Sequence, residues 1–384
     1  MKIIVATALY PPEIGRLSIY TKDLVNNLKA YNKVTVLAYA NQIELEEGVD
    51  ILIVDKSKPL FIRLIRYTWS LFKLAKQADI IYVQNAVAAG LPAIIVKYFS
   101  GKPVIINFFE DEAWHRAINL RLSKQSLKEF LEKPKLNEAI RKIVHTQTWV
   151  LRRATKIVFS SKSLAELVSK KYKISEEKIV INYSPENRSQ KLVFENQKDT
   201  LQLFVRGPLL VWTGMADIIK SVAKLKKEFK DIKLIISGEG NDKSELKKIA
   251  KEFDIFDNIK FLGQISQAEN WYLLKTSKVY IHNFTDFDPD NNITQSFLAG
   301  TVVVAVDNDF NREILSQAQG VVFIQEDGSE GIYKAVKKVL EDNNLSQKLV
   351  NSAKINLDNH FSWKAHINRL NNLFSDIIKS KYGK

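Results

Sequence analysis

The stretch Lys2-Ile-Ile-Val-Ala-Thr7, followed by Pro11-Pro12 and by the helical segment Ser18–Leu28, carries the pattern on which the fold prediction rests. Short apolar runs rich in β-branched residues alternate with amphipathic helical segments along the whole chain. This alternation is typical of parallel sheets with crossover helices. In the first half we predict strands at Lys2–Thr7, Lys33–Ala38, Asp50–Val54, Ile80–Gln84, Pro103–Asn107, Lys156–Ser160 and Lys178–Ile181, and a further helix at Ser163–Lys171. In the second half we predict strands at Val211–Thr213, Lys233–Ser237, Ile259–Leu262, Val279–His282, Val302–Val306 and Val321–Phe323.

The length of 384 residues predicts two domains, because a single hydrophobic core stops growing at about 250–300 residues. The polar segment Asn182–Gln190, interrupted by Pro185, is predicted to be the linker. We therefore expect an α/β fold with two Rossmann-like, doubly wound domains facing a cleft, at residues 1–184 and 185–360. Ligands of such sheets bind beyond the carboxyl ends of the strands, so candidate residues are sought in the turns there.

The composition excludes several kinds of chemistry. The chain has no cysteine, which rules out disulfides, thiolate metal sites and cysteine nucleophiles. Its formal net charge of +14 indicates an anionic partner such as a nucleotide, a nucleic acid or acidic lipid headgroups, although Lys-rich helices such as Lys220–Lys230 are typical of solvated faces. We find no zinc-finger spacing and no aromatic RNA-binding signature, so we expect no nucleic-acid partner.

Neither an export signal nor a membrane span is predicted. The N-terminal stretch lacks a basic leader and a long apolar core. The longest apolar stretch, Ala78–Phe99, is interrupted by polar residues and by Pro92. We expect a cytoplasmic protein.

The first predicted turn, Tyr10-Pro-Pro-Glu-Ile-Gly15-Arg16, joins a strand to a helix that carries Ser18 in its first turn. Gly15 allows the backbone to approach a ligand, and the N–H groups of the helix start suit an anion. A plain loop with a helix cap is the alternative.

This turn resembles the Tyr-Pro-Pro-x-x-Gly-Gly motif of the family 4 glycosyltransferases (glycosyltransferase group 1), with Arg16 in the place of the second glycine. The resemblance extends over essentially the whole chain. It implies the GT-B architecture, with an acceptor-side first domain and a donor-binding second domain. Phe361-Ser-Trp363 is similar to the signature that starts the last helix of the family, so residues 361–384 are expected to return to the first domain.

The resemblance also implies catalytic carboxylates in the first domain. Asn107-Phe-Phe-Glu110-Asp111-Glu112 falls where many members have a His-Asp pair on the sugar and acceptor side. Glu110 replaces the histidine and Asp111 is retained, so both are candidate catalytic residues. A solvated acidic loop is the alternative. Ser163 is expected to cap the next helix.

In the second domain the donor site departs from the family pattern. Members read Gly-Arg-Leu-x-x-x-Lys-Gly, with both cations on the donor diphosphate, whereas Pro208 and Thr213 occupy those positions here. Arg206 and Arg16 are our candidates to supply the missing charge. The expected donor-binding residues of the turns are Gly15, Arg16, Arg206, Gly207, Thr213, Gly214, Gly238, Gly263 and Gln264.

Further donor residues are implied near position 290. Gln295 stands at the glutamate that contacts ribose in the family, and Asn291 and Asn292 lie at the diphosphate turn. Asp288, beside the family's other glutamate position, is a third candidate catalytic residue. Asp286, Asp288 and Asp290 could together hold a divalent metal, but the family does not generally need one, so we expect neither a metal nor a cofactor beyond the donor.

The expected function is retaining transfer of a sugar from a nucleotide-diphosphate sugar to a sugar or lipid-linked acceptor, in glycan, polysaccharide or glycolipid synthesis. A catalytically impaired homologue that serves as a binding or partner subunit is the alternative, since both family cations are replaced. The segment Lys58–Lys76 mixes basic and bulky apolar residues at helical spacing. It is expected either to lie on an anionic membrane surface, at the inner face, or to pack on the sheet.

Overall fold

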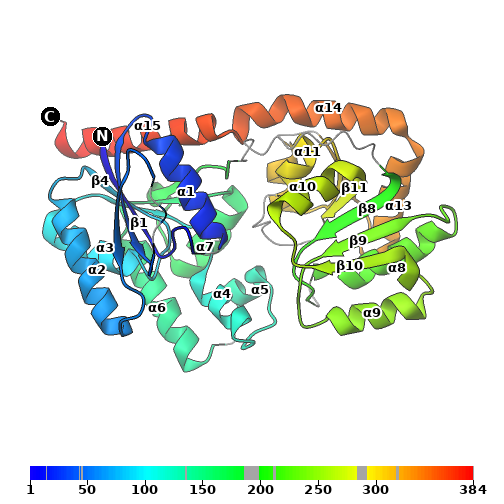
Figure 1. Ribbon diagram of the computed structural model, residues 1–384, viewed down its shortest axis with the longest axis horizontal. Coiled ribbons are helices and arrows are strands. Elements are labelled where there is room, and N and C mark those ends of the chain that lie inside the picture. The colour runs from blue at the N-terminus through cyan, green and yellow to red at the C-terminus, as the bar shows by residue number, and fades with distance from the viewer. Residues whose placement is uncertain are drawn as a thin grey trace. The chain divides into compact units, whose positions relative to one another are not determined.

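The computed structural model describes residues 1–13, 15–42, 44, 46–134, 136–185, 199–210, 213–282, 292–316 and 320–383, a few of them, Arg16 among these, by their backbone alone. The chain divides into two compact units (Figure 1). Unit 1 comprises Met1–Tyr183 and Trp363–Lys384, and unit 2 comprises Ser184–Ser362. Each unit contains one parallel sheet with helices, so the predicted fold class of two Rossmann-like α/β domains is confirmed.

The sheet of unit 1 has the strand order β3-β2-β1-β4-β5-β6-β7, and all its pairings are parallel. Its strands are β1 (Lys2–Thr7), β2 (Lys33–Tyr39), β3 (Asp50–Val54), β4 (Ile80–Val83), β5 (Val104–Asn107), β6 (Lys156–Phe159) and β7 (Ile179–Ile181). Each agrees with its predicted range to within one residue at either end. The helices of this unit are α1 (Arg16–Leu28), α2 (Leu60–Ala75), α3 (Gly90–Ser100), α4 (Glu112–Asn119), α5 (Leu127–Glu132), α6 (Glu138–Arg153), α7 (Lys162–Tyr172) and α15 (Trp363–Tyr382).

The sheet of unit 2 has the order β10-β9-β8-β11-β12-β13 and is also parallel. Its strands are β8 (Asp199–Arg206), β9 (Lys233–Ser237), β10 (Ile259–Gly263), β11 (Ser277–His282), β12 (Val302–Val306) and β13 (Val321–Ile324). Its helices are α8 (Met215–Lys226), α9 (Lys243–Glu252), α10 (Gln267–Thr276), α11 (Asn292–Leu298), α12 (Asp309–Ser316), α13 (Gly328–Glu341) and α14 (Asn343–His360). Helices α8, α9 and α13 share one core with the sheet.

The strand predicted at Val211–Thr213 is not present at Thr213, the one residue of the three that the structure describes. The first strand of unit 2 is β8, where Leu203, Phe204 and Val205 are fully buried. Thr213 lies in a turn, and both its N–H and its hydroxyl donate to the carbonyl oxygen of Leu210. Val211 and Trp212 lie outside the described residues. A β-branched and aromatic triplet has the composition of a strand, but Gly207-Pro208 before it and Gly214, with φ of 66°, after it favour a turn.

The predicted cap of α7 is also misplaced. Ser161, not Ser163, precedes this helix, and its side chain accepts the N–H of Leu164. The helix begins at Lys162, one residue before the predicted start, because Ser161 has the extended backbone that an N-cap requires. Ser163 lies inside the first turn.

The last helix, α15, belongs to unit 1, where it lies beside α1 (Figure 1). Its apolar residues Leu370 and Phe374 join the core formed with Val5 and Tyr82. At its start, His366 forms hydrogen bonds of 2.9 Å to the hydroxyl of Tyr20 and to the carbonyl oxygen of Tyr183. A carbonyl can only accept, so Nδ1 carries the proton and Nε2 accepts from Tyr20. Burial lowers the pKa of His366 to about 3, which keeps the ring neutral.

Candidate functional site

The turns that follow β8, β9 and β10 are bound together by backbone hydrogen bonds. Gly207 N–H donates to Ser237 O at 3.0 Å, and Leu209 N–H donates to Glu239 O at 3.1 Å. Gly238 N–H in turn donates to the carbonyl oxygen of Gly263 at 2.8 Å. Three turns that are distant in the sequence therefore form one backbone surface at the carboxyl edge of this sheet, and it carries the predicted residues Gly207, Gly238 and Gly263.

The glycines of this surface are required by its own packing. A Cβ atom at Gly238, whose φ is 141°, would lie 1.9 Å from the carbonyl oxygen of Gly207. A Cβ atom at Gly240 would lie 2.2 Å from the carbonyl oxygen of Leu209. Gly263 has φ of 74°. The sequence analysis listed Gly238 and Gly263 as donor-binding residues and did not list Gly240. The structure shows that Gly238 and Gly240 allow the turns to meet. Gln264, which follows Gly263, is exposed.

Neither replacement at the two family cation positions brings a charge. Pro208 is exposed, and Thr213 is fully buried with its hydroxyl donating to Leu210 O at 2.7 Å. Gly214, in the left-handed region, precedes α8 as its N-cap. Arg206 is the last residue of β8 and is half-buried. Within the part of the chain that the structure describes, no carboxylate pairs with Arg206.

A chain of three buried amides lies where α10 meets α11. Asn270 Nδ2 donates to Gln295 Oε1 at 2.7 Å and approaches Asn292 Oδ1 at 3.4 Å. The two predicted residues, Asn292 and Gln295, are thus joined by a third amide that the sequence analysis missed. In the sequence, Asn270 stands out as a polar residue among the apolar residues Trp271 and Leu274, and α10 buries all three. The sequence of this helix alone does not show which residue Asn270 would bind.

Two other predicted residues, Asp288 and Asn291, lie outside the described residues, as do Asp286 and Asp290. His282, at the end of β11 just before them, is buried and neutral because desolvation lowers its pKa to about 3. Among the residues that the structure describes, no group of three or more His, Asp or Glu side chains is placed to hold a metal ion.

In unit 1, Asp111 is a buried cap rather than an open carboxylate. Its Oδ1 accepts the N–H of Trp114 at the start of α4, and its Oδ2 accepts hydrogen bonds from Gln147 and Tyr172. Burial raises the pKa of Asp111, and these three donors oppose the shift. Its contacts fix the start of α4 and so position its two glutamate neighbours.

Glu110 and Glu112 have different surroundings. Glu110 is partly exposed and pairs with Nδ1 of His115 at 2.8 Å. Glu112 Oε1 accepts the N–H of Val87 at 2.5 Å, and its Oε2 accepts Asn85 Nδ2 at 3.2 Å. Both contacts lie in the turn after β4. Of the three carboxylates, Glu110 and Glu112 are both partly exposed, but Glu112 also binds the start of α4 to the turn after β4.

Glu112 should make the stability of unit 1 depend on pH. Burial raises the pKa of Glu112 from 4.5 to about 7, so the folded chain binds more protons than the unfolded chain between these values. The free energy of unfolding should therefore fall as the pH rises from 4.5 to 7, by about 3 kcal/mol from this group. Urea unfolding of wild type and Glu112→Gln at pH 5, 6 and 7 measures the effect, since the variant lacks this part of the decline.

Glu132→Gln, at an exposed position, is the control for that comparison and should retain the wild-type decline. Equal pH slopes for wild type and Glu112→Gln would show that Glu112 does not titrate in this range.

In the first turn, Gly15 is the N-cap of α1, and its carbonyl oxygen accepts the N–H of Ile19 at 3.2 Å. No side chain caps the helix, and Ser18 is buried inside the first turn. The N–H groups of this helix start thus lack a side-chain acceptor, as the anion-binding prediction requires. The side chain of Arg16 lies outside the described residues.

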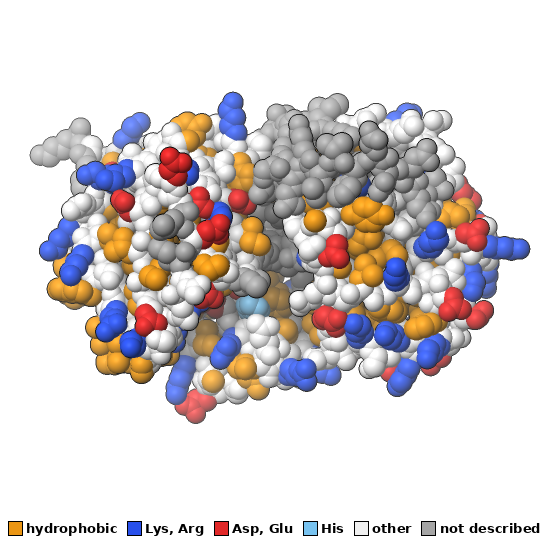
Figure 2. Space-filling view, viewed as in Figure 1, with side chains coloured by type: hydrophobic (Ala, Val, Ile, Leu, Met, Phe, Trp, Pro, Cys, Tyr) orange, Lys and Arg blue, Asp and Glu red, His pale blue; other side chains and the backbone are white. Residues whose placement is uncertain are grey.

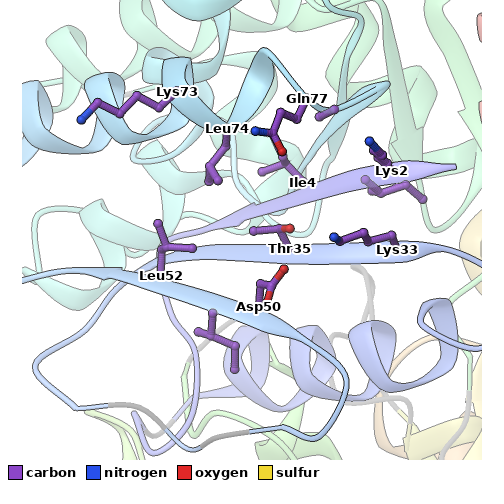
Figure 3. Close-up of a pocket in the computed structure, with 12 residues that line it drawn as sticks. Lys2, Ile4, Lys33, Thr35, Asp50, Leu52, Lys73, Leu74 and Gln77 are labelled. Atoms are coloured by element: carbon purple, nitrogen blue, oxygen red, sulfur yellow. The ribbon is translucent and has the colours of Figure 1, made fainter.

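A hollow of about 480 Å³ lies at the amino edge of the sheet of unit 1 (Figure 3). Lys2, Lys33 and Asp50, which begin β1, β2 and β3, line it together with the end of α2. It lies at the amino ends of the strands and contains none of the predicted site residues. Because ligands of open α/β sheets bind beyond the carboxyl ends of the strands, we do not expect this hollow to be the substrate site.

Two family models match adjoining parts of the chain. The one described as Glycosyltransferase Family 4 matches residues 17–185, and the one described as Glycosyl transferases group 1 matches residues 184–356. In overall fold the chain is similar to the crystal structure of Anabaena Alr3699/HepE in complex with UDP, with a TM-score of 0.72 and 15% identity over 98% of this chain and 100% of that one. The chain therefore belongs to the group 1 glycosyltransferases with the GT-B fold, which confirms the predicted family and class of enzyme.

Similar curated proteins include an uncharacterised glycosyltransferase of Methanocaldococcus jannaschii, 26% identical over 49% of this chain and 48% of that protein. Another is the N-acetylgalactosamine-N,N'-diacetylbacillosaminyl-diphospho-undecaprenol 4-alpha-N-acetylgalactosaminyltransferase of Campylobacter jejuni, 28% identical over 53% of this chain and 55% of that protein. The matches span about half the length of each relative.

Proposed function

We propose that this chain transfers a glycosyl group from a nucleotide-diphosphate sugar to the hydroxyl of a sugar or lipid-linked acceptor, with retention of anomeric configuration. Unit 2 binds the donor and unit 1 presents the acceptor. The reaction serves glycan, polysaccharide or glycolipid synthesis at the inner face of the membrane. The observation that carries the proposal is the surface formed by the turns after β8, β9 and β10. Arg206 lies at its edge and pairs with no carboxylate among the described residues.

Each part of this surface suits a nucleotide diphosphate. Close backbone turns that only glycine permits leave no side chain between the backbone and a bound diphosphate. Arg206 would stabilise the charge that develops on the departing diphosphate, a task that Pro208 and Thr213 leave unfilled. The amides of Asn292 and Gln295 can bond ribose hydroxyls, and Glu110 with His115 can bind the acceptor hydroxyl. Asp288, which lies outside the described residues, is proposed as a further catalytic residue.

Two relatives support the choice of substrates. The Anabaena structure contains UDP, and the Campylobacter protein is named for a lipid-linked diphospho-undecaprenol acceptor.

A screen of UDP-, GDP- and ADP-sugars by thermal shift tests donor binding, since a ligand at 100 times its Kd stabilises the folded state by about 2.7 kcal/mol. Turnover of the best donor is then followed by release of the nucleoside diphosphate, and the anomeric proton of the product is assigned by NMR. We expect one base to be preferred and the donor configuration to be retained. The proposal fails if none of the nucleotides stabilises the chain.

The alternative of a binding or partner subunit is favoured by one observation, the absence of a charge at Pro208 and Thr213. It predicts that nucleotide sugars bind but that no acceptor, whether sugar or lipid-linked, supports release of nucleoside diphosphate. The same screen and turnover assay therefore separate the two functions.

Replacing Asn270 by leucine should weaken nucleotide binding about 3- to 10-fold, because a net hydrogen bond contributes roughly 0.5–1.5 kcal/mol and Gln295 loses its partner. Calorimetric titration with the preferred nucleoside diphosphate measures the change. Asn258→Leu is the matched control, since Asn258 donates to Ile232 O at 2.9 Å near the amino ends of β9 and β10. The control should lose similar stability and keep its nucleotide affinity. Unchanged affinity in Asn270→Leu would contradict a role for Gln295.

A further inference from the structure

Helix α2 carries two apolar stripes on opposite faces. Tyr67, Leu71 and Ala75 recur every four residues and are fully buried. Phe61, Ile65 and Trp69 recur with the same spacing, offset by two residues, and are 71%, 52% and 59% exposed. An offset of two residues corresponds to about 200° around a helix, so these stripes lie on opposite sides. The sequence offered packing on the sheet or contact with a membrane as alternatives, and the geometry of α2 allows both.

The exposed stripe is part of a larger apolar surface. Helix α3 contributes Tyr98 and Phe99, which are 65% and 77% exposed. Between α2 and α3 runs a groove with an almost entirely apolar lining. The lining residues are Leu64, Ile65, Thr68, Trp69, Phe72, Ile95, Val96 and Phe99. Figure 2 shows hydrophobic side chains gathered at the lower left, where α2 lies in Figure 1, with Lys and Arg side chains among them. Contiguous apolar patches of this kind mark interaction sites.

The charges on α2 and α3 are all positive, and most of those around them are too. Residues 56–102 contain eight Lys or Arg and a single acidic residue, Asp79. Asp55, just before this range, has its pKa lowered mainly by hydrogen bonds to Ser57 and in smaller part by the charges of Lys58 and Arg66. Asp79 lies just before β4 and accepts the backbone N–H of Lys2 at 2.8 Å, at the amino edge of the sheet. Lys73 and Lys76 lie 5.3 and 5.4 Å from the ring centres of Trp69 and Phe72, so their long side chains cover aromatic surface while their charged ends stay outside.

These charges decide between the occupants that an apolar surface can have. A second copy of this chain would bring the same cations against these ones, with no Asp or Glu on α2 or α3 to pair with them. A bilayer with anionic headgroups has an apolar interior that can take up the aromatic side chains and negative charges that can pair with the surrounding Lys and Arg side chains. Tyr98 and Trp69 are also the residue types that membrane interfaces favour.

We propose that the exposed faces of α2 and α3 dock unit 1 onto an anionic lipid bilayer. Phe61, Ile65, Trp69 and Phe99 enter the headgroup region, and Arg66, Lys73 and Lys76 bind the lipid phosphates. None of the helices in the described ranges is both long and apolar enough to span a membrane, and docking through one face requires no span.

Co-sedimentation with vesicles tests the proposal. Wild type should bind vesicles of phosphatidylcholine with 30% phosphatidylglycerol, and its binding should weaken with added salt and vanish on pure phosphatidylcholine. Phe61→Ser/Trp69→Ser/Phe99→Ser should lower the partition coefficient at least 10-fold. Arg66→Gln/Lys73→Gln should lower it about 25-fold, since each cation near the surface contributes about 5-fold.

Matched controls lie in unit 2. Phe253→Ser removes an apolar side chain that is 45% exposed, and Lys227→Gln/Lys230→Gln removes two exposed cations. Both should bind as wild type does. Circular dichroism checks that every variant is folded, and binding is measured without turnover, so failure of the transferase proposal would not affect it.

Three results would overturn the proposal. The first is binding of wild type to neither vesicle or to both equally, and the second is wild-type binding by the α2 and α3 variants. The third is dimerisation of wild type that the serine variant abolishes. The last result would assign the surface to a second copy of this chain.

Discussion

Replacing Gly238 by alanine should abolish nucleotide binding and destabilise unit 2 by at least about 3 kcal/mol. The new Cβ atom would lie 1.9 Å from the carbonyl oxygen of Gly207, and the backbone at Gly238 has φ of 141°, which side chains rarely adopt. The turns after β8 and β9 would have to separate, because neither atom belongs to a flexible side chain. Urea unfolding and calorimetric titration with a nucleoside diphosphate measure the two effects.

Gly48→Ala is the matched control for this variant. Gly48 has φ of 75°, but a Cβ atom there meets no atom within 4 Å. The control should cost about 1 kcal/mol from backbone strain alone and leave nucleotide binding unchanged. If Gly238→Ala folded and bound nucleotide as wild type does, the joined turns could not be the donor site.

Replacing Arg206 by alanine should weaken the binding of a nucleoside diphosphate about 10- to 100-fold, because a hydrogen bond to a charged group contributes roughly 1.5–3 kcal/mol. The corresponding nucleoside, which has no phosphate, should bind equally well to variant and wild type. Titration of both ligands under the same conditions therefore isolates the contribution of the charge, and Arg206→Lys should recover part of it.

Two further variants complete this series. Lys230→Ala removes an exposed cation near the amino end of β9 and should leave both affinities unchanged. Arg16→Ala tests the other candidate cation by the same titrations. Equal losses for nucleoside and nucleoside diphosphate in Arg206→Ala would mean that Arg206 supports the fold rather than the phosphates.

The fold was predictable because its signals are local. In unit 1 the central strands β1, β4, β5 and β6 are mainly apolar and buried, a pattern that parallel strands covered on both faces share. In unit 2 one prediction was misleading, a strand at Val211-Trp-Thr213, which has the composition of a strand. Propensity favoured a strand there, whereas Thr213, the described residue of the three, lies in no strand, and its N–H and hydroxyl both donate to Leu210 O.

The site was predictable only in part, because its decisive features are contacts between segments that are distant in sequence. Gly238 was recognised as a turn glycine, but its approach to Gly207 depends on how β8 and β9 pair. The bond from Asn270 to Gln295 joins two helices, and the raised pKa of Glu112 comes from burial by the turn after β4. None of these has a signature in one stretch of residues.

The split of unit 1 between the two ends of the chain has a consequence for synthesis on the ribosome. Residues 184–362 form one continuous run and can fold while residues 363–384 are still inside the exit tunnel. Until α15 emerges, the side chains of Val5, Leu24 and Tyr82 lack the cover that Leu370 and Phe374 later provide. The apolar surface of the N-terminal sheet thus stays partly exposed while residues 184–362 are translated. At this stage we expect the nascent chain to depend on chaperones.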